Sequence, residues 1–137
     1  MLRKILLHGF GAGILAAIAA LVYQQIYFKS LGADFSTVIS AAGIVATSVG
    51  ATLLASFAYG FLFQKSLKDK APVVFNLLLL LLSFVSIAGP FAVKLPLELE
   101  APELFPGLTV PMHFFPALAW LALSPLFDPV KVISKAE

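Results

Sequence analysis

Four long runs of uncharged, mostly apolar residues alternate along the chain with short polar segments. The runs cover residues 5–28, 36–63, 73–93 and 110–127. A helix needs ~17–25 predominantly apolar residues to cross the hydrocarbon core of a bilayer, and each run is long enough. Because so little chain lies outside the runs, no room remains for a separate soluble domain. The pattern predicts an all-α polytopic membrane protein, with residues 1–137 forming one four-helix transmembrane bundle.

The composition strengthens this prediction. Of the 137 residues, 61% are hydrophobic and 12% are charged, whereas about 25% are charged in a typical soluble domain.

The first run follows Arg3 and Lys4 and contains Ala17-Ile18-Ala19, which resembles a signal-peptide cleavage site. The apolar core of a signal peptide is only ~7–15 residues long, so we interpret this longer run as a membrane helix.

The charge and the cysteine count exclude several kinds of site. The chain has no cysteine, which excludes disulfides, thiolate nucleophiles and cysteine-ligated metals. Its net charge of +2 is too small to indicate nucleic-acid binding. No Asp, Glu, Lys or Arg lies within any of the four runs, which argues against a proton-coupled antiporter or a carrier of charged substrates.

The basic residues are distributed unequally between the two sides that four membrane crossings would define. Four crossings place both termini on one side, together with Arg3, Lys4, Lys65, Lys68, Lys70, Lys131 and Lys135. Only Lys29 and Lys94 fall on the other side. Since lysine and arginine are enriched in cytoplasmic loops, this distribution predicts that both termini are cytoplasmic.

The predicted outer loop, residues 94–109, alternates apolar and polar residues and contains three prolines. This pattern indicates an extended segment, with leucines toward lipid or protein and carboxylates toward water. Glu98, Glu100 and Glu103 could form an acidic catalytic pair, but no partner residues converge on them. We therefore expect the three glutamates to form a solvated, negatively charged lid.

Small residues recur at helical spacing in the first two runs. Ser36 or Thr37 is expected to cap the second helix. The first run carries Gly9, Gly13, Ala16 and Ala20, and the second carries Ser36, Ser40, Gly43, Thr47 and Gly50. Such rows allow close contact between membrane helices, so we expect these two helices to pack as antiparallel neighbours. The same rows could instead form a homodimer interface.

The segment PMHFFPALAW (111–120) concentrates prolines and polar atoms in an apolar run. Thr109 is expected to cap this helix, with Pro111 in its first turn, where a missing N–H costs little. Pro116 lies deeper and should kink the helix beside His113, because it leaves a backbone carbonyl without its partner. Pro90 is expected to kink the third helix in the same way.

By its spacing, the last helix should carry four residues on one face: His113, Ala117, Trp120 and Ser124. One face of the third helix should carry Asn76, Ser83 and Ser86. His113 could make a structural hydrogen bond, contact a ligand or a proton, or, least favoured, bind a metal. His8 is expected near the cytoplasmic edge, and Tyr23 and Tyr27 as interfacial anchors.

A polar layer opening outward is the predicted site. Gln24 and Gln25 point about 100° apart, so at least one should face the bundle. With Ser36, Ser40, Ser86 and His113 they would form this layer, and Trp120 lies on the same helix face as His113. We expect no catalytic residues, no cofactor and no metal, because no nucleophile–base or metal-ligating constellation exists.

The stretch from GPFAVKLP to ELFPGLTVPMHFFPALAW resembles uncharacterised small four-helix bacterial inner-membrane proteins, mainly over residues 89–120. This resemblance implies the four-helix arrangement and a bacterial inner-membrane location, and it implies no activity. We expect an accessory subunit that packs against lipids, other membrane subunits or further copies of itself. The alternative is a protein that binds or transports a small ligand in the outward-opening polar pocket.

Overall fold

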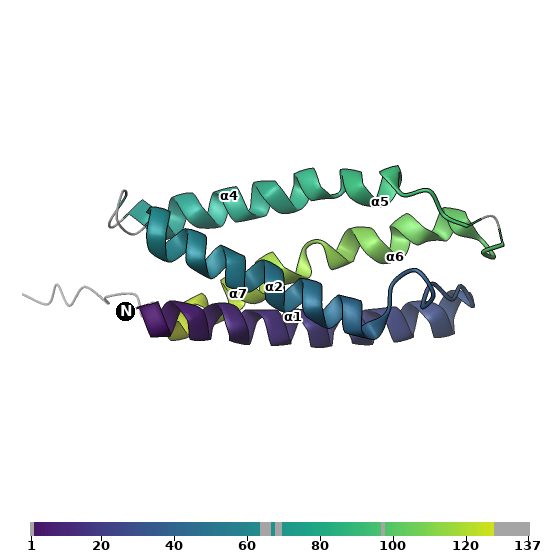
Figure 1. Ribbon diagram of the computed structural model, residues 1–137, viewed down its shortest axis with the longest axis horizontal. Coiled ribbons are helices and arrows are strands. Elements are labelled where there is room, and N and C mark those ends of the chain that lie inside the picture. Colours follow the sequence, from purple (N-terminus) through teal and green to yellow (C-terminus); the bar gives the residue numbers. More distant parts are fainter. Residues whose placement is uncertain (1, 64–66, 68–69, 97, 128–137) are drawn as a thin grey trace, which may run out of the picture.

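The structure, a computed structural model, describes residues 2–63, 67, 70–96 and 98–127, and this part of the chain is all-helical. Four helical stretches in it are long and apolar enough to cross a membrane: Leu2–Leu31, Ala41–Phe61, Ala71–Ala92 and Pro102–Phe127. The prediction of four such helices is therefore confirmed. They run side by side in alternating directions, and the first helix begins at the end of the bundle where the last helix finishes (Figure 1).

Helix α1 (Leu2–Leu31) runs the full length of the bundle. Its buried residues recur every three or four positions and so lie on one face: Ile5, His8, Gly9, Ala12, Gly13, Ala16, Ala17 and Ala20. This face packs against α2 (Ala41–Ala58) and α7 (Phe115–Phe127). The opposite face exposes large apolar side chains such as Phe10 and Ile18, which suits a helix surrounded by lipid.

The turn after α1 is held by local hydrogen bonds. Gly32 has a φ of 71°, a left-handed conformation that commonly ends helices and suits glycine. Two residues later, the Asp34 carboxylate accepts a hydrogen bond from the backbone N–H of Ser36 at 2.8 Å. This bond favours the charged carboxylate and lowers the pKa of Asp34.

The N-cap of α2 is Ser40, whose hydroxyl accepts a hydrogen bond from the N–H of Gly43 at 3.1 Å. The prediction of Ser36 or Thr37 as the cap was wrong. Residues 36–39 form a separate turn, in which the Ile39 N–H donates to a carbonyl four residues earlier. The hydroxyl of Ser40 is the one placed directly before the first helical turn, where free backbone N–H groups need acceptors.

The third stretch is divided into α4 (Ala71–Ser86) and α5 (Ala88–Ala92), with Ile87 between them. Pro90 has no N–H, so it cannot donate to the carbonyl of Ser86. The helix is interrupted next to that carbonyl. Helix α4 packs against α7 and against the short π-helical segment η1 (Tyr59–Phe63) that follows α2.

The fourth stretch contains a 3₁₀ turn, η3 (Pro102–Leu104), then α6 (Phe105–Met112) and then α7. A turn at residues 113–114 separates α6 from α7. Pro116 is the second residue of α7, and its missing N–H leaves the Met112 carbonyl without its usual helical partner. The interruption therefore lies between the proline and that carbonyl, in the same way as in the third stretch.

The prediction that residues 94–109 form an extended outer loop was wrong over its second half, because residues 102–109 are helical. Pro102 and Pro106 lie in the first turns of η3 and α6, where proline favours helix formation. Thr109 is consequently inside α6 and not its cap, and its hydroxyl donates to the carbonyl four residues earlier at 2.9 Å. Pro111 is likewise inside the helix and not in its first turn.

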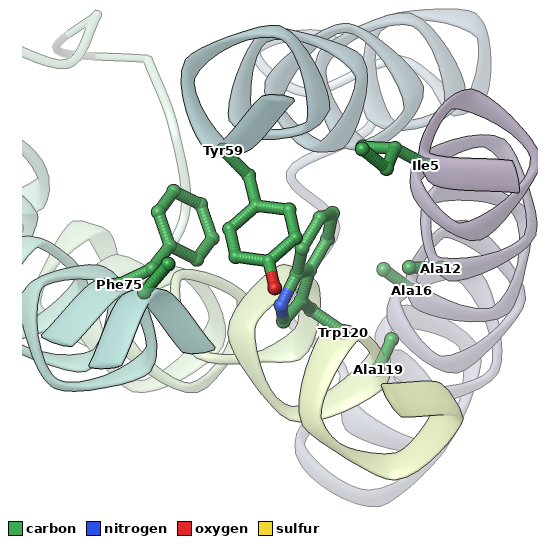
Figure 2. Close-up of a cluster of buried hydrophobic side chains, with 8 residues drawn as sticks. Ile5, Ala12, Ala16, Tyr59, Phe75, Ala119 and Trp120 are labelled. Atoms are coloured by element: carbon green, nitrogen blue, oxygen red, sulfur yellow. The ribbon is translucent and has the colours of Figure 1, made fainter. Parts of the chain in front are cut away.

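Two separate apolar clusters hold the ends of the bundle. Figure 2 shows most of the first, in which the Trp120 ring lies 5.3 Å from Phe75 and 5.9 Å from Tyr59, measured between ring centroids. The first cluster contains Ile5, Ala12, Ala16, Tyr59, Ala71, Phe75, Ala119 and Trp120. The second, at the opposite end, contains Ala33, Phe35, Phe105 and Leu108. The middle of the bundle lies between these clusters.

Candidate functional site

A cavity of about 780 Å³ occupies the middle of the bundle. Phe75 and Trp120 of the first cluster line one end. Ile39 and Met112, which pack against the second cluster, line the other. From Phe75 to Ser86, the α4 wall spans roughly 16 Å at 1.5 Å per residue. The cavity is thus elongated along the helices.

The cavity opens sideways, between α2 and α4. Leu54 on α2 and Leu78 and Leu82 on α4 line it, yet their side chains are 71%, 46% and 63% exposed. Residues that line a cavity and are also exposed lie at its mouth. In Figure 1, α2 and α4 approach each other near η1 and diverge toward the other end.

The lining is mainly apolar, with a small number of hydroxyl groups. Polar residues in the lining come from α2, α4 and the fourth stretch. They are Thr47, Ser48 and Thr52 on α2, Ser83 and Ser86 on α4, and Thr109 and His113 on the fourth stretch. No Asp, Glu, Lys or Arg is among the described lining residues. Pockets of this size and composition are typical of sites for small, uncharged, apolar ligands.

His113 is the one titratable residue among those that line the cavity. Its Nδ1 lies 2.8 Å from the Thr109 carbonyl oxygen. A carbonyl can only accept, so Nδ1 carries the proton in the neutral ring and Nε2 is left as an acceptor. His113 lies in the turn between α6 and α7, and the helix break lets its ring bond back to the last turn of α6.

Trp120 closes the cavity at the end near the first cluster, and its side chain is 2% exposed. Its indole N–H donates to Asn76 Oδ1 at 3.2 Å, which joins α7 to α4. His8, which was expected near the cytoplasmic edge, packs against this tryptophan. His8 is buried, stacks on the Trp120 ring at 4.0 Å, and its Nε2 donates to the Trp120 carbonyl at 2.9 Å.

The structure does not assemble the polar layer expected from sequence. Ser86 and His113 line the cavity together, but Gln24 donates to the Ile39 carbonyl at 3.0 Å and stabilises the loop before α2. Gln25, like Ser36 and Ser40, is exposed. Gln24 therefore serves the loop, and neither glutamine is among the described residues that line the cavity.

Tyr23 and Tyr27 also have roles other than the expected interfacial anchoring. Their hydroxyls donate to the carbonyls of Gly107 at 3.0 Å and Leu104 at 2.7 Å. Both bonds cross from α1 to the start of the fourth stretch. A side chain on Gly107 would collide with the Tyr27 hydroxyl, so this glycine allows the close approach. The two tyrosines hold α6 against α1.

Helix α1 contacts α2 through Gly9 and Gly13, as the packing hypothesis proposed. The face of α2 that meets these glycines is different from the one proposed. A Cβ on Gly13 would lie 2.7 Å from the Val49 Cα, and one on Gly9 would collide with Ser56. The buried residues of α2 are Ile44, Ser48, Thr52 and Ser56.

The α2 residues that sequence assigned to this contact lie elsewhere. Ser40 and Thr47 are exposed. Thr47 bonds within its own helix, and a Cβ on Gly50 would meet nothing within 4 Å. The nearest atom to a Cβ on Gly43 is the hydroxyl oxygen of Ser40, in the same segment. The assignment was wrong because α2 has two faces with small residues, and only one of them meets α1.

Ser48, Thr52 and Thr109 were missed as lining residues. Ser48 and Thr52 are four residues apart, as are Gly9 and Gly13. This shared spacing was the signal in the sequence that could have indicated that Ser48 and Thr52 point into the bundle. Thr109 was interpreted as a cap because the start of the helix was placed too late.

Acid–base and metal-ligating groups are scarce among the described residues of the site. Within the described residues, no three His, Cys, Asp or Glu side chains are grouped so that they could hold a metal ion. The glutamates at 98, 100 and 103 are exposed and lie in the segment before α6. His113 is a single acid–base group, without a second titratable residue in the lining.

No protein-family model, curated protein or solved structure matches this chain.

Proposed function

We propose that this chain is a non-catalytic integral membrane protein that binds an uncharged, mainly apolar small molecule in the cavity between α2, α4, α6 and α7. The observation that carries the proposal is the elongated 780 Å³ cavity, mainly apolar and lacking charged residues among those described in its lining. Ligand cavities are commonly about 300–1,000 Å³ and carry a few polar groups that orient the ligand. This site favours the ligand-binding alternative over the accessory-subunit role.

The position of the opening supports a ligand that arrives through the bilayer. The exposed residues at the mouth, such as Leu78 and Leu82, belong to helices apolar enough to cross a membrane. A mouth between two such helices faces hydrocarbon and not water. An apolar molecule would move from lipid into the cavity with little change in solvation, while its polar group would gain hydrogen bonds.

The test is a matched pair of substitutions on α2. Ala46 and Ala51 are both exposed on this helix, but only Ala51 lines the cavity. The parent protein and both variants are purified from native membranes in mild detergent, and bound small molecules are identified by mass spectrometry. Ala51→Phe should lose most of the bound molecule and Ala46→Phe should keep it. Equal retention by both variants, or no bound molecule in the parent, would contradict the proposal.

A second candidate is the accessory-subunit function. The same lateral opening favours it, because a helix of another membrane protein or of a second copy of this chain could occupy the opening. Co-purification separates the two. A stable larger complex that Ala51→Phe disrupts and Ala46→Phe preserves would support this second function. An isolated chain that carries a small molecule would support the first.

We further propose that the protein lies in a bacterial inner membrane with both termini in the cytoplasm. The support is the excess of lysine and arginine on one side of the four helices. Because the chain has no cysteine, single cysteines report topology directly. Cysteine at Ser66 should be protected from impermeant thiol reagents in intact cells, and cysteine at Ala101 should react. The opposite pattern would invert the proposed orientation.

A further inference from the structure

The polar groups of the cavity are almost all hydrogen-bond acceptors. A serine or threonine hydroxyl has one hydrogen to donate and two lone pairs that accept. Five hydroxyls in the lining already donate their hydrogen to a carbonyl of the same stretch at 2.7–3.0 Å, namely those of Thr47, Thr52, Ser83, Ser86 and Thr109. The Thr52 hydroxyl faces Gly13 of α1, and each of the other four can therefore offer only lone pairs to a ligand.

His113 adds a stronger acceptor. Its Nδ1 hydrogen is engaged by the Thr109 carbonyl, which fixes Nε2 as the unprotonated nitrogen of the neutral ring. Within the described residues, Nε2 makes no hydrogen bond. The imidazole is partly buried and lies beside the helix break, with Pro116 and Met112 also in the lining.

Donors are scarce in the same lining. The indole N–H of Trp120 is engaged by Asn76. Ser48, 8% exposed, is the one lining hydroxyl whose hydrogen has no acceptor among the described residues. A ligand that only accepts hydrogen bonds would find this single donor, whereas a ligand that donates would find several acceptors.

We propose that the ligand is a lipid alcohol: a long apolar chain with a neutral hydroxyl group that donates a hydrogen bond to His113 Nε2. This inference rests on the proposed function, because it names the ligand class of the same cavity. The hydroxyl lies at the level of Ser86 and His113, and the chain extends toward Phe75 and Trp120 along the leucines of α4. Esters, ketones and ethers of the same length bind more weakly, because they offer no donor to the acceptor-rich wall.

The single tryptophan of the chain provides the readout. Trp120 lines the cavity but is shielded from lipid, so quenching of its fluorescence reports occupancy. The probes are a long-chain fatty alcohol brominated at mid-chain and its methyl ether, in which a methyl group replaces the donor hydrogen. From His113 to Trp120 the helical rise is roughly 10 Å, so bromines at mid-chain come near the indole. Each probe is titrated into bilayer nanodiscs that contain the full chain.

In the parent protein, the alcohol should reach half-maximal quenching at about a tenfold lower mole fraction than the ether, the ratio expected for one good hydrogen bond. His113→Phe, which keeps an aromatic ring but has no acceptor, should reduce this ratio to about twofold or less. His113→Gln retains a carbonyl acceptor and should keep most of the preference, which guards against a folding defect. Ala46→Phe should behave like the parent.

The outcomes separate this inference from the proposed function. Saturable quenching by both probes at equal mole fractions would overturn the lipid-alcohol assignment and leave the binding function standing. A tenfold preference that survives in His113→Phe would overturn the role of His113. If neither probe quenches Trp120 saturably in the parent, both the ligand class and the binding function are wrong.

Discussion

The two faces of α2 differ in how closely they are packed. Toward α1, the side chains of Thr52 and Ser56 press against Gly9 and Gly13 with no room for a further atom. Toward α4, Thr47, Ala51 and Leu54 face a cavity. Both faces carry small residues, so small size alone does not bring helices together.

The difference lies in the partner helix. Helix α1 presents glycines at a spacing of four, and short hydroxyl side chains at the same spacing fit against them. The Ser56 hydroxyl also bonds across the interface, to the Ile5 carbonyl at 3.1 Å. Helix α4 presents leucines to the cavity instead of glycines. Close packing therefore needs small residues on both helices, and one-sided small residues leave a space that a ligand can use.

The largest expected effect tests the tight interface. Gly13→Leu should destabilise the bundle by about 3 kcal/mol, because its side chain would have to displace the backbone near Val49. The matched control is Gly50→Leu on α2, where a Cβ meets nothing within 4 Å, and its cost should stay within about 0.5 kcal/mol. Unfolding in a detergent titration measures both. Equal losses would show that the two faces of α2 are packed alike.

An intermediate effect is expected from the hydroxyls. Ser56→Ala removes the bond to α1 and should cost about 1 kcal/mol. Ser83→Ala removes a bond within α4 only, to the Leu79 carbonyl, at the edge of the cavity. This variant should cost less than about 0.5 kcal/mol in the same titration. A larger loss for Ser83→Ala than for Ser56→Ala would reverse the comparison between the two faces.

The smallest effect is expected at the mouth of the cavity. Leu82 lines the cavity but is 63% exposed, so Leu82→Ala should change the free energy of unfolding by less than about 0.5 kcal/mol. Truncation of a closely packed leucine typically costs about 2–5 kcal/mol. A loss in that range would mean that α2 and α4 close together in the bilayer and that the cavity is absent there.

The candidate site was only partly accessible to sequence reasoning. Helical spacing from His113 to Trp120 predicted a shared face, and the structure places both in the lining of one cavity. The same reasoning included Gln24 and Gln25 because they are polar and adjacent. Those glutamines serve or flank the α1–α2 loop instead. Spacing reports the face of one helix and not which other helix meets that face.

The prolines show a similar limit. Pro102 and Pro106 were interpreted as features of an extended loop, yet each lies in the first turn of a helical segment. Proline is compatible with both conformations. In this case the choice follows from contacts far away in sequence, because Tyr23 and Tyr27 of α1 bond to the start of the fourth stretch.

The amino-acid sequence by itself determined the all-helical class and the number of long apolar helices, because apolar length and scarcity of charge are local properties that neighbouring helices do not alter. The tertiary structure decided which face of α2 meets α1, that His8 is buried against Trp120, and that α2 and α4 stand apart around a cavity. These features depend on the fit between side chains distant in the chain. In an apolar chain, helices lack a strong hydrophobic preference for one face over another, so shape and hydrogen bonding select the contacts.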